Sequence, residues 1–173
     1  MNLKKMQVID LTKTINASTD SLWNIMVTNF GNVANYTPTL YFSRYANELR
    51  EVAGCERHCT LSSNGKKYLV ERLDFVDKKN HTYRVKFKES SEPIDKELSF
   101  VQFTLTPINT STTKIKTHME YRTKPAFIGF LAKRQFIKIF RDMFIGLEHY
   151  EKSGEKINAS IGNFKKIKKN YQY

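Results

Sequence analysis

Arg57 and Glu71 are the two residues of this 173-residue chain whose types and positions suggest chemistry. Each falls on the apolar side of a predicted β-strand, at 54–61 and 67–76, because side chains alternate between the two faces of a strand. The apolar residues that share these phases are Cys55, Cys59 and Leu61 on the first strand, and Leu69, Leu73 and Phe75 on the second. An unpaired charge in such surroundings is costly, so each of the two charges should pair with the other.

This pair has two interpretations. It is either a satisfied structural ion pair, inside the sheet or in water at its rim, or the polar anchor of an apolar pocket that binds a carboxylate, hydroxyl or keto group. Glu71 is also placed to act as an acid or base, with Arg57 or a tyrosine polarising a carbonyl. We find no Ser-His-Asp arrangement, glycine-rich phosphate loop or in-phase pair of carboxylates, so the sequence favours binding over catalysis. We assign no catalytic residue.

The same alternation on later strands and on the C-terminal helix predicts the remaining ligand contacts. With Arg57 and Glu71, they are Tyr83, Phe87, Phe103, Thr117, Met119, Tyr121, Phe136, Phe140 and Phe144. Most of these should simply be core, but the hydroxyls of Tyr83, Thr117 and Tyr121 need hydrogen-bond partners if they are buried. His118 falls on the opposite phase and is expected to face solvent rather than act as a base, and His58 is similar.

Cys55 and Cys59 are the only cysteines. Four residues apart on one strand, their Cα atoms would lie about 13 Å apart, which is too far for a disulfide. We expect two buried thiols. His58 lies between them, but a zinc site needs a second cluster of ligands that the sequence does not provide, so neither a metal nor a cofactor is expected.

Strand and helix patterns must position these residues. Residues 8–15 alternate as a half-buried strand, and Ser18 or Thr19 can cap a following helix that Gly31 would end; a second short helix fits 33–36. Six further segments alternate with a period of two: 41–49, 54–61, 67–76, 81–89, 97–106 and 114–122. Short turns join them, which favours an antiparallel meander. Residues 127–152 have apolar spacings of three and four, typical of one long amphipathic helix.

These elements predict an α+β fold in which a curved, seven-stranded antiparallel sheet wraps around the long C-terminal helix, with two short helices after the first strand. A helix across the concave face leaves an internal space unless large side chains fill it. Access to that space should depend on the loop 90–96 and on 124–132. The latter is apolar all round, so it is either a well-packed helix start or a lid that meets a membrane or a partner.

Three segments carry a family resemblance. They are 15–38, from Ile-Asn-Ala-Ser-Thr-Asp-Ser-Leu-Trp to Tyr-Thr-Pro; Gly54-Cys55-Glu56-Arg57, similar to a Gly-x-x-Arg strand; and Val70-Glu71-Arg72-Leu73, similar to a Glu-Arg-Leu strand. Together they resemble the SRPBCC superfamily, which includes START lipid-transfer domains, polyketide cyclase-like proteins, the major birch-pollen allergen and the plant abscisic-acid receptors. The resemblance covers about residues 8–150 and implies the helix-grip fold. It also implies a pocket position for Glu71, since the matching glutamate of the hormone receptors lines their pocket.

The resemblance implies a helix-grip ligand-binding domain over 1–152, followed by a basic tail over 153–173 that is either an extra helix or disordered. We expect this domain to bind or transport a small hydrophobic or amphipathic ligand, such as a lipid, an isoprenoid or an aromatic polyketide. One alternative is a polyketide cyclase or dehydratase that uses Glu71 in the same cavity. The other is an interaction module whose basic surface binds membrane or nucleic acid. The fold alone does not decide among them.

The chain carries a formal net charge of +12. From Lys124 onward there are eleven Lys and Arg against four acids, so this part supplies +7 of the total. The excess is either a solvated surface or a contact for an anionic membrane through the basic C-terminal helix and tail. Nucleic acid is not an expected partner, because no aromatic side chains interleave with the basic ones. Residues 1–6 lack the apolar stretch of a signal peptide, so we expect a cytoplasmic location.

Overall fold

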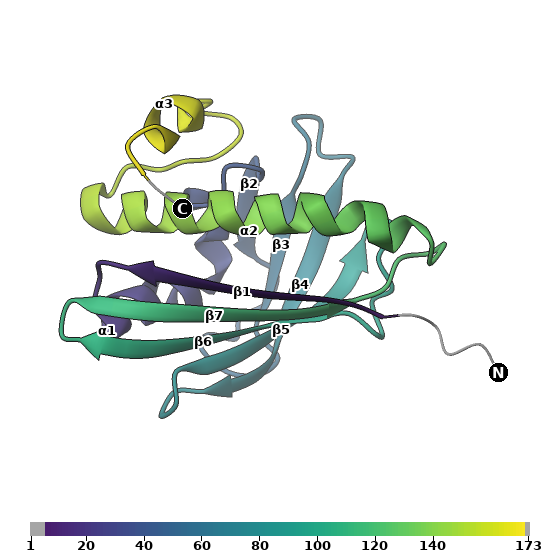
Figure 1. The fold of residues 1–173 in the computed structure, drawn as a ribbon. Helices are drawn as coiled ribbons and strands as arrows, with labels where there is room; N and C mark the ends of the chain where they lie inside the picture. The colour runs from purple at the N-terminus through teal and green to yellow at the C-terminus, as the bar shows by residue number, and fades with distance from the viewer. Residues whose placement is uncertain (1–5, 172–173) are drawn as a thin grey trace.

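The computed structural model describes residues 6–171. Residues 1–5 of the predicted domain and residues 172–173 of the predicted tail lie outside the described residues. The chain opens with β1 (Gln7–Ile15), α1 (Thr19–Trp23), the π-helical η1 (Asn24–Thr28) and the 3-10 helix η2 (Phe30–Asn35). The next strands are β2 (Phe42–Tyr45), β3 (Glu56–Thr60), β4 (Tyr68–Asp77), β5 (Thr82–Ser90), β6 (Phe100–Asn109) and β7 (Thr112–Tyr121). The chain continues with α2 (Ile128–Ser153) and α3 (Phe164–Lys168) (Figure 1).

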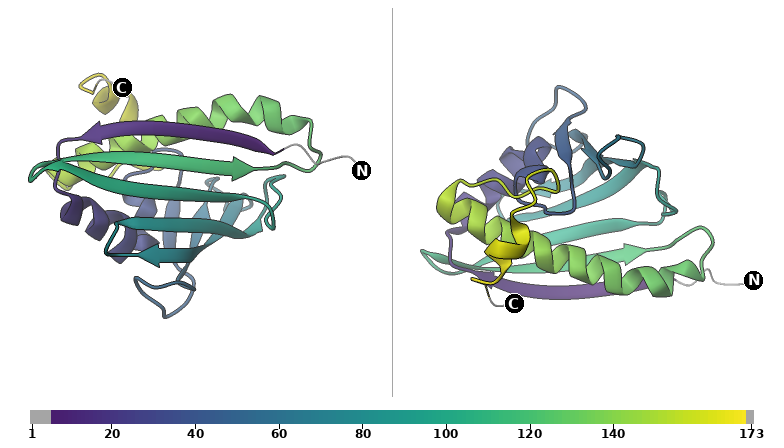
Figure 2. Two further views of the ribbon diagram at one scale, coloured as in Figure 1. Left: turned by 60° about the horizontal axis from the view of Figure 1, so that its bottom comes forward. Right: turned by 90° about the horizontal axis from the view of Figure 1, so that it is seen from above.

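All seven strands form one antiparallel sheet in the order β1-β7-β6-β5-β4-β3-β2. The strands from β2 to β7 follow one another as a meander, and β1 adds to β7 along its whole length, from Gln7 opposite Tyr121 to Ile15 opposite Thr113. The sheet is curved, and α2 lies across its concave side (Figures 1 and 2). The predicted fold class is therefore confirmed.

The helices after β1 close one end of the sheet. The side chain of Ser18 accepts a hydrogen bond from the backbone N–H of Ser21 at 3.1 Å and caps α1, which leaves the Thr19 hydroxyl to bond Thr113 at 3.0 Å. The prediction that Gly31 ends the first helix is wrong, because Gly31 lies inside η2. Its role is steric instead: a Cβ at this position would collide with the ring of Tyr45.

The second strand is much shorter than the predicted 41–49, since β2 ends at Tyr45. Asn47 explains the difference. Its side-chain oxygen accepts hydrogen bonds from the backbone N–H groups of Leu49 and Glu56, so the chain turns away from the sheet instead of continuing the strand. Glu51 in the same loop has a positive φ of 55°.

The alternation predicted for 67–76 is broken within β4. Leu73 lies opposite Val85, but Phe75 lies opposite Arg84, so the residue between them has no counterpart on β5. Such a bulge reverses the phase of every later side chain. Phe75, expected on the inner face, is therefore 43% exposed, whereas Val76 packs against the core.

The two halves of α2 differ in how they are covered. From Phe140 to Glu148 every residue except Arg141 is buried, because the sheet covers one side and residues 157–167 cover the other. Ile157 and Ile167 are buried in that contact, and the buried carboxylate of Asp142 lies 2.6 Å from Lys138 and 2.6 Å from Lys168. The first half of α2 lacks this second layer (Figure 2). Among residues 6–171, no helix is long and apolar enough to cross a membrane.

Candidate functional site

Arg57 and Glu71 meet on the concave face as the sequence predicts. They are directly opposite on β3 and β4, and Nε of Arg57 donates to Oε2 of Glu71 at 2.7 Å. Nη1 of Arg57 donates to the backbone carbonyl of Phe30 at 3.1 Å, and the guanidinium stacks 3.9 Å from the centroid of the Phe30 ring. The thiol of Cys59 contacts the same Glu71 oxygen at 3.6 Å. The short helix η2 thus completes a charged pair that two strands bring together.

Three neutral groups surround this pair. Burial raises the pKa of the Tyr36 phenol to about 12, and burial with the nearby Glu71 raises the pKa of the Cys59 thiol. Burial also raises the pKa of Tyr83 well above its ordinary range. Burial alone would lower the pKa of Arg57, but Glu71, Cys59 and Tyr36 outweigh it, and the pKa lies above its usual value. At neutral pH the site therefore holds one cation and three protonated groups able to donate hydrogen bonds.

An aromatic wall extends from this polar cluster to α2. The ring of Tyr83 stacks on Phe103 with centroids 5.1 Å apart, and Phe103 meets Phe140 edge-on at 6.2 Å. Farther along α2, Phe136 lies 4.8 Å from Tyr121, whose hydroxyl donates to the carbonyl of Gly129 at 2.6 Å. Offset and edge-on aromatic pairs of this kind stabilise the packing beyond their buried area.

Thr117 has a buried hydroxyl for which no hydrogen-bond partner is found in the described part of the chain. Thr113 lies on the same inner face of β7, and its hydroxyl donates to the carbonyl of Ala17 at 2.8 Å. Of these two buried threonines, only Thr113 is therefore satisfied by the protein itself. A buried hydroxyl without a partner costs about 1–3 kcal/mol, so Thr117 calls for an explanation beyond packing.

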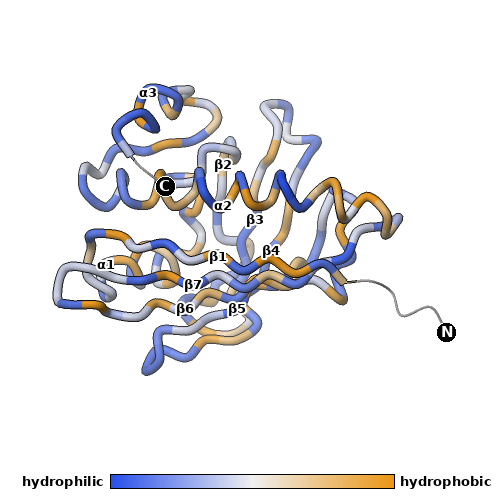
Figure 3. The backbone as a smooth tube through the Cα atoms, viewed as in Figure 1, coloured by the Kyte–Doolittle hydropathy of each residue, from blue (hydrophilic) through white to orange (hydrophobic). Residues whose placement is uncertain are grey.

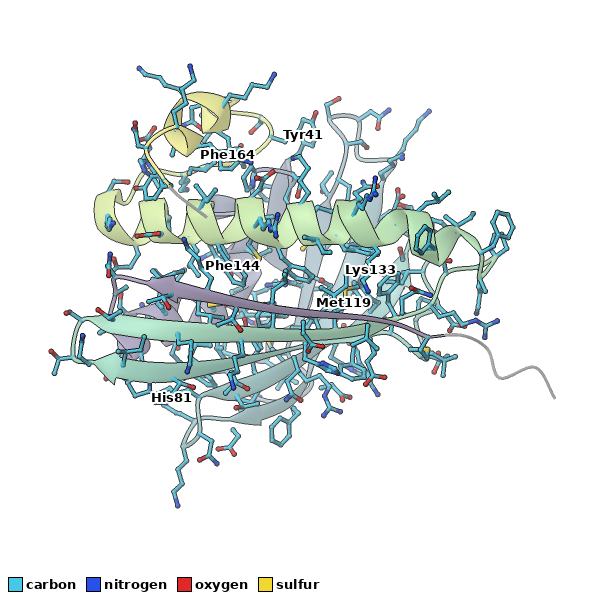
Figure 4. The ribbon with its side chains drawn as sticks, viewed as in Figure 1. Tyr41, His81, Met119, Lys133, Phe144 and Phe164 are labelled. Carbon is cyan, nitrogen blue, oxygen red and sulfur yellow. The ribbon has the colours of Figure 1, made fainter. Side chains whose placement is uncertain are left out.

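One end of the core is less completely buried than the rest, and we call it the open end. The inward-facing apolar residues there are only partly buried, and they are Leu61, Leu69, Ile94, Ala132, Phe136 and Ile137. The loop before β6 is held at this end by the pairing of Ile94 with Thr123. Elsewhere between α2 and the sheet, large side chains fill the space, as Phe144 does beneath α2 (Figure 4).

Two hollows mark the surface outside this interior. One, of about 260 Å³, lies over β1, β7 and β6, and the other, of about 160 Å³, lies over β4 and β5. His118 lines the first hollow, on the outer face as expected, with Nδ1 2.7 Å from Asp10 and Nε2 3.1 Å from Glu120. Hydrogen bonds to these carboxylates raise the pKa of His118. His58 is also outward and stacks on Tyr68 at 5.4 Å.

The predicted contacts divide into three groups. The first is the polar cluster around Arg57 and Glu71, to which Tyr83 belongs electrostatically. The second comprises the aromatic and neighbouring residues of the interior, all buried: Phe87, Phe103, Thr117, Met119, Tyr121, Phe140 and Phe144. Phe136, which is half-buried, forms the third group at the open end.

Sequence reasoning missed Tyr36 and the Phe30 carbonyl. Both belong to η2 and its C-terminal boundary, where no strand phase could indicate which side chains face inward. Cys59 was predicted as a buried thiol, which is confirmed, but its contact with Glu71 was not predicted. In the described part of the chain, no group of three or more His, Cys, Asp and Glu side chains is arranged to hold a metal ion.

Solved structures share this architecture. Ara h 8.0201 is similar with a TM-score of 0.69 and 17% identity, covering 86% of this chain and 99% of its own. A START superfamily protein from Mycobacterium smegmatis has a TM-score of 0.69 and 11% identity, covering 84% and 97%. Norcoclaurine synthase from Thalictrum flavum, solved with dopamine and hydroxybenzaldehyde, has a TM-score of 0.62 and 14% identity, covering 83% and 85%.

No family model matches the sequence, and no curated protein matches it either. The structural likeness nevertheless defines the architecture, because these neighbours cover 86% and 84% of this chain. The chain has the helix-grip fold that these solved structures share.

Proposed function

We propose that this protein binds a small hydrophobic or amphipathic ligand between α2 and the concave face of its sheet. The observation that carries the proposal is the Arg57–Glu71 pair, buried on an otherwise apolar face and surrounded by protonated donors. Replacing such a pair by apolar residues of similar volume often leaves a core as stable or more stable, so packing alone does not call for the pair. A polar anchor within an apolar wall is what an amphipathic ligand requires.

Two further observations support a ligand. The unpartnered Thr117 hydroxyl offers a second polar contact on the inner face. The half-buried residues at the open end, among them Phe136 and Ile137, offer a route inward. Because aromatic side chains occupy much of the interior, ligand entry requires the first half of α2 and its Phe136 to move outward.

The similar structures agree with this function at a general level. Norcoclaurine synthase was solved with two small aromatic molecules, and another neighbour is a START superfamily protein. We propose lipids, isoprenoids and aromatic polyketides as the classes to test first.

Catalysis by Glu71 is the second candidate. Its carboxylate is the only one on the described inner face that lies within a polar cluster, but Oε2 already accepts from Arg57 and contacts Cys59. A general base must reach a substrate proton at hydrogen-bond distance, and with Oε2 held by Arg57 only Oε1 of the carboxylate is left for that contact. Ligand binding therefore has the stronger support.

Native mass spectrometry of the purified protein, followed by organic extraction, tests the proposal. A stoichiometric apolar or amphipathic compound would support it and identify the ligand class. If the protein carries nothing, titration with fatty acids, isoprenoids and aromatic polyketides follows. An empty protein that binds none of these would refute the proposal.

A further inference from the structure

The first turns of α2 expose three large apolar side chains to solvent. Phe127, Phe130 and Leu131, here called the apolar tip, are exposed to 76%, 73% and 71%. They lie next to one another at the N-terminal end of the helix, where the hydropathy colouring changes from blue to orange (Figure 3). Single exposed apolar residues are common on protein surfaces, but a contiguous group of this size usually marks a contact site.

The second half of the same helix shows what covers an apolar outer face in this protein. There Ile145 is buried, and the C-terminal segment, whose Ile157 and Ile167 are also buried, lies over this half of the helix (Figure 1). That segment ends above the C-terminal half of α2, far from the tip (Figures 1 and 2). Within the described chain the apolar tip thus has no equivalent cover.

The charges around the tip indicate which partner would cover it. Between Tyr121 and Asp142 the sequence has six Lys and Arg residues and no acid. Arg134, which follows the tip, is exposed, and no carboxylate pairs with it in the described structure, whereas Lys133 is half-buried and lies between α2 and the sheet (Figure 4).

The acids of the adjacent loop do not cancel this charge. Glu92 pairs with Lys67 at 3.4 Å, and Asp95 lies 3.5 Å from Lys124. Glu97 lines a hollow together with four cations, which are Arg72, Lys86, Lys88 and Lys96. The surroundings of the tip therefore remain positive.

We infer that the apolar tip docks into an anionic lipid bilayer. Aromatic and leucine side chains followed by cations match the interface of such a bilayer, where apolar groups enter the acyl region and cations meet the headgroups. A second protein copy would place the cations of both tips against each other, which disfavours self-association. The inference does not depend on a ligand in the interior, although docking would bring the open end close to the membrane.

Sedimentation with lipid vesicles tests the inference. The full chain should bind vesicles of phosphatidylcholine with about one third phosphatidylglycerol more tightly than vesicles of phosphatidylcholine alone, and added salt should weaken the binding. Replacing the tip by F127Q, F130Q and L131Q should weaken binding at least about tenfold, because the buried apolar area is lost. These side chains are exposed, so the fold should be unaffected, which circular dichroism checks.

Two matched controls separate the tip from other surfaces. F42Q with I108Q removes apolar side chains that are 56% and 55% exposed elsewhere, and it should bind vesicles like the unchanged protein. R134Q should weaken binding about fivefold, because one exposed charge next to the tip is removed. K165Q removes one charge from α3 and should have a smaller effect.

Four results would overturn the inference. They are the absence of binding to anionic vesicles, unchanged binding by the tip variant, an equal loss in the F42Q and I108Q control, and a larger loss from K165Q than from R134Q. The last result would assign membrane binding to the basic tail instead. A concentration-dependent dimer that the tip variant abolishes, seen by analytical ultracentrifugation, would show that a second copy covers the tip.

Discussion

Arg57 makes two contacts in the site beyond its ion pair with Glu71. It bonds Glu71, donates to the Phe30 carbonyl and stacks on the Phe30 ring, so it connects β3, β4 and η2. A buried pair of this kind contributes little compared with apolar residues of similar volume, yet breaking it is costly, because one charge is left without its partner. The contribution of the Arg57–Glu71 pair to the free energy of unfolding can therefore be measured by removing one partner or both.

Replacing one partner should cost more than replacing both. R57M and E71L alone should each lower the free energy of unfolding by about 3–5 kcal/mol, and the double variant should lose clearly less than the sum. Urea denaturation of the four proteins measures these differences. If the single losses simply added up in the double variant, the two side chains would not be coupled as the 2.7 Å contact implies.

Thr117 and Thr113 form a natural pair of tests on the same face of β7. T117V removes a hydroxyl without a partner, so unfolding should require the same free energy or up to about 1–3 kcal/mol more, while affinity for a ligand that bonds this hydroxyl should fall. T113V removes bonds to Ala17 and Thr19, so it should destabilise the fold and spare ligand affinity. Thermal unfolding with and without ligand measures both effects. A stability loss in T117V equal to that in T113V would contradict this assignment.

His118 should make stability depend on pH. Its pKa is raised in the folded protein by hydrogen bonds to Asp10 and Glu120, so the protonated form is stabilised by folding. This contribution is complete below the unfolded pKa and is lost as the pH rises through the folded pKa. H118Q should therefore be less stable than the unchanged protein near pH 6, and the difference should disappear near pH 9. A difference that grew with pH would contradict the sign.

At the scale of elements, the tail is part of the packing of α2. Ile157 is fully buried, whereas Ile161 in the same segment is 49% exposed. I157A should lower the free energy of unfolding by about 2–5 kcal/mol, and I161A should change it little. Chemical denaturation of both variants tests this. Similar small effects in both would mean that the C-terminal segment does not stabilise the helix.

The elements show how far periodicity can predict this fold. The inward phase of β3, β5, β6 and β7 could be counted correctly over their interior residues, because the burial of these residues alternates with a period of two, in β5 up to Phe87. In β4 the predicted alternation fails at Phe75, because the residue before it has no counterpart on β5 and every later side chain points to the opposite face of the sheet. No residue type in the sequence indicates this bulge. In β2 the side chain of Asn47 ended the strand early, a local hydrogen-bond choice that an alternating pattern does not reveal.

The candidate site was predictable to the same extent. Two charges on the inward phases of adjacent strands had to face each other, and they do, as Arg57 and Glu71. The third side of the cluster comes from η2, where Tyr36 and the Phe30 carbonyl are placed by tertiary packing. That packing depends on Gly146, because a side chain at this position of α2 would collide with the Tyr36 carbonyl. No local pattern relates residues so far apart in the sequence.

In the molecule as a whole, the C-terminal half of α2 is covered on both sides, whereas its N-terminal half is covered on one side only. The C-terminal half lies between the sheet and residues 157–167, with buried Phe144 and Leu147 on its inner side. The N-terminal half contacts the sheet through Tyr121 and Gly129 but exposes its outer side. Local opening should therefore be easier in the N-terminal half, since fewer buried contacts oppose it.

Hydrogen exchange of the free protein and of its ligand complex tests this division. In the free protein, amides of α2 from about residue 132 to 139 should exchange faster than those from 140 to 148, because only the latter are covered on both sides. A ligand held between α2 and the sheet should slow exchange mainly in the first half and raise the melting temperature as its concentration increases. Equal protection along the whole helix would place the ligand elsewhere. Protection confined to 132–139 would show that this half of α2 is the wall of the site that moves when the ligand binds.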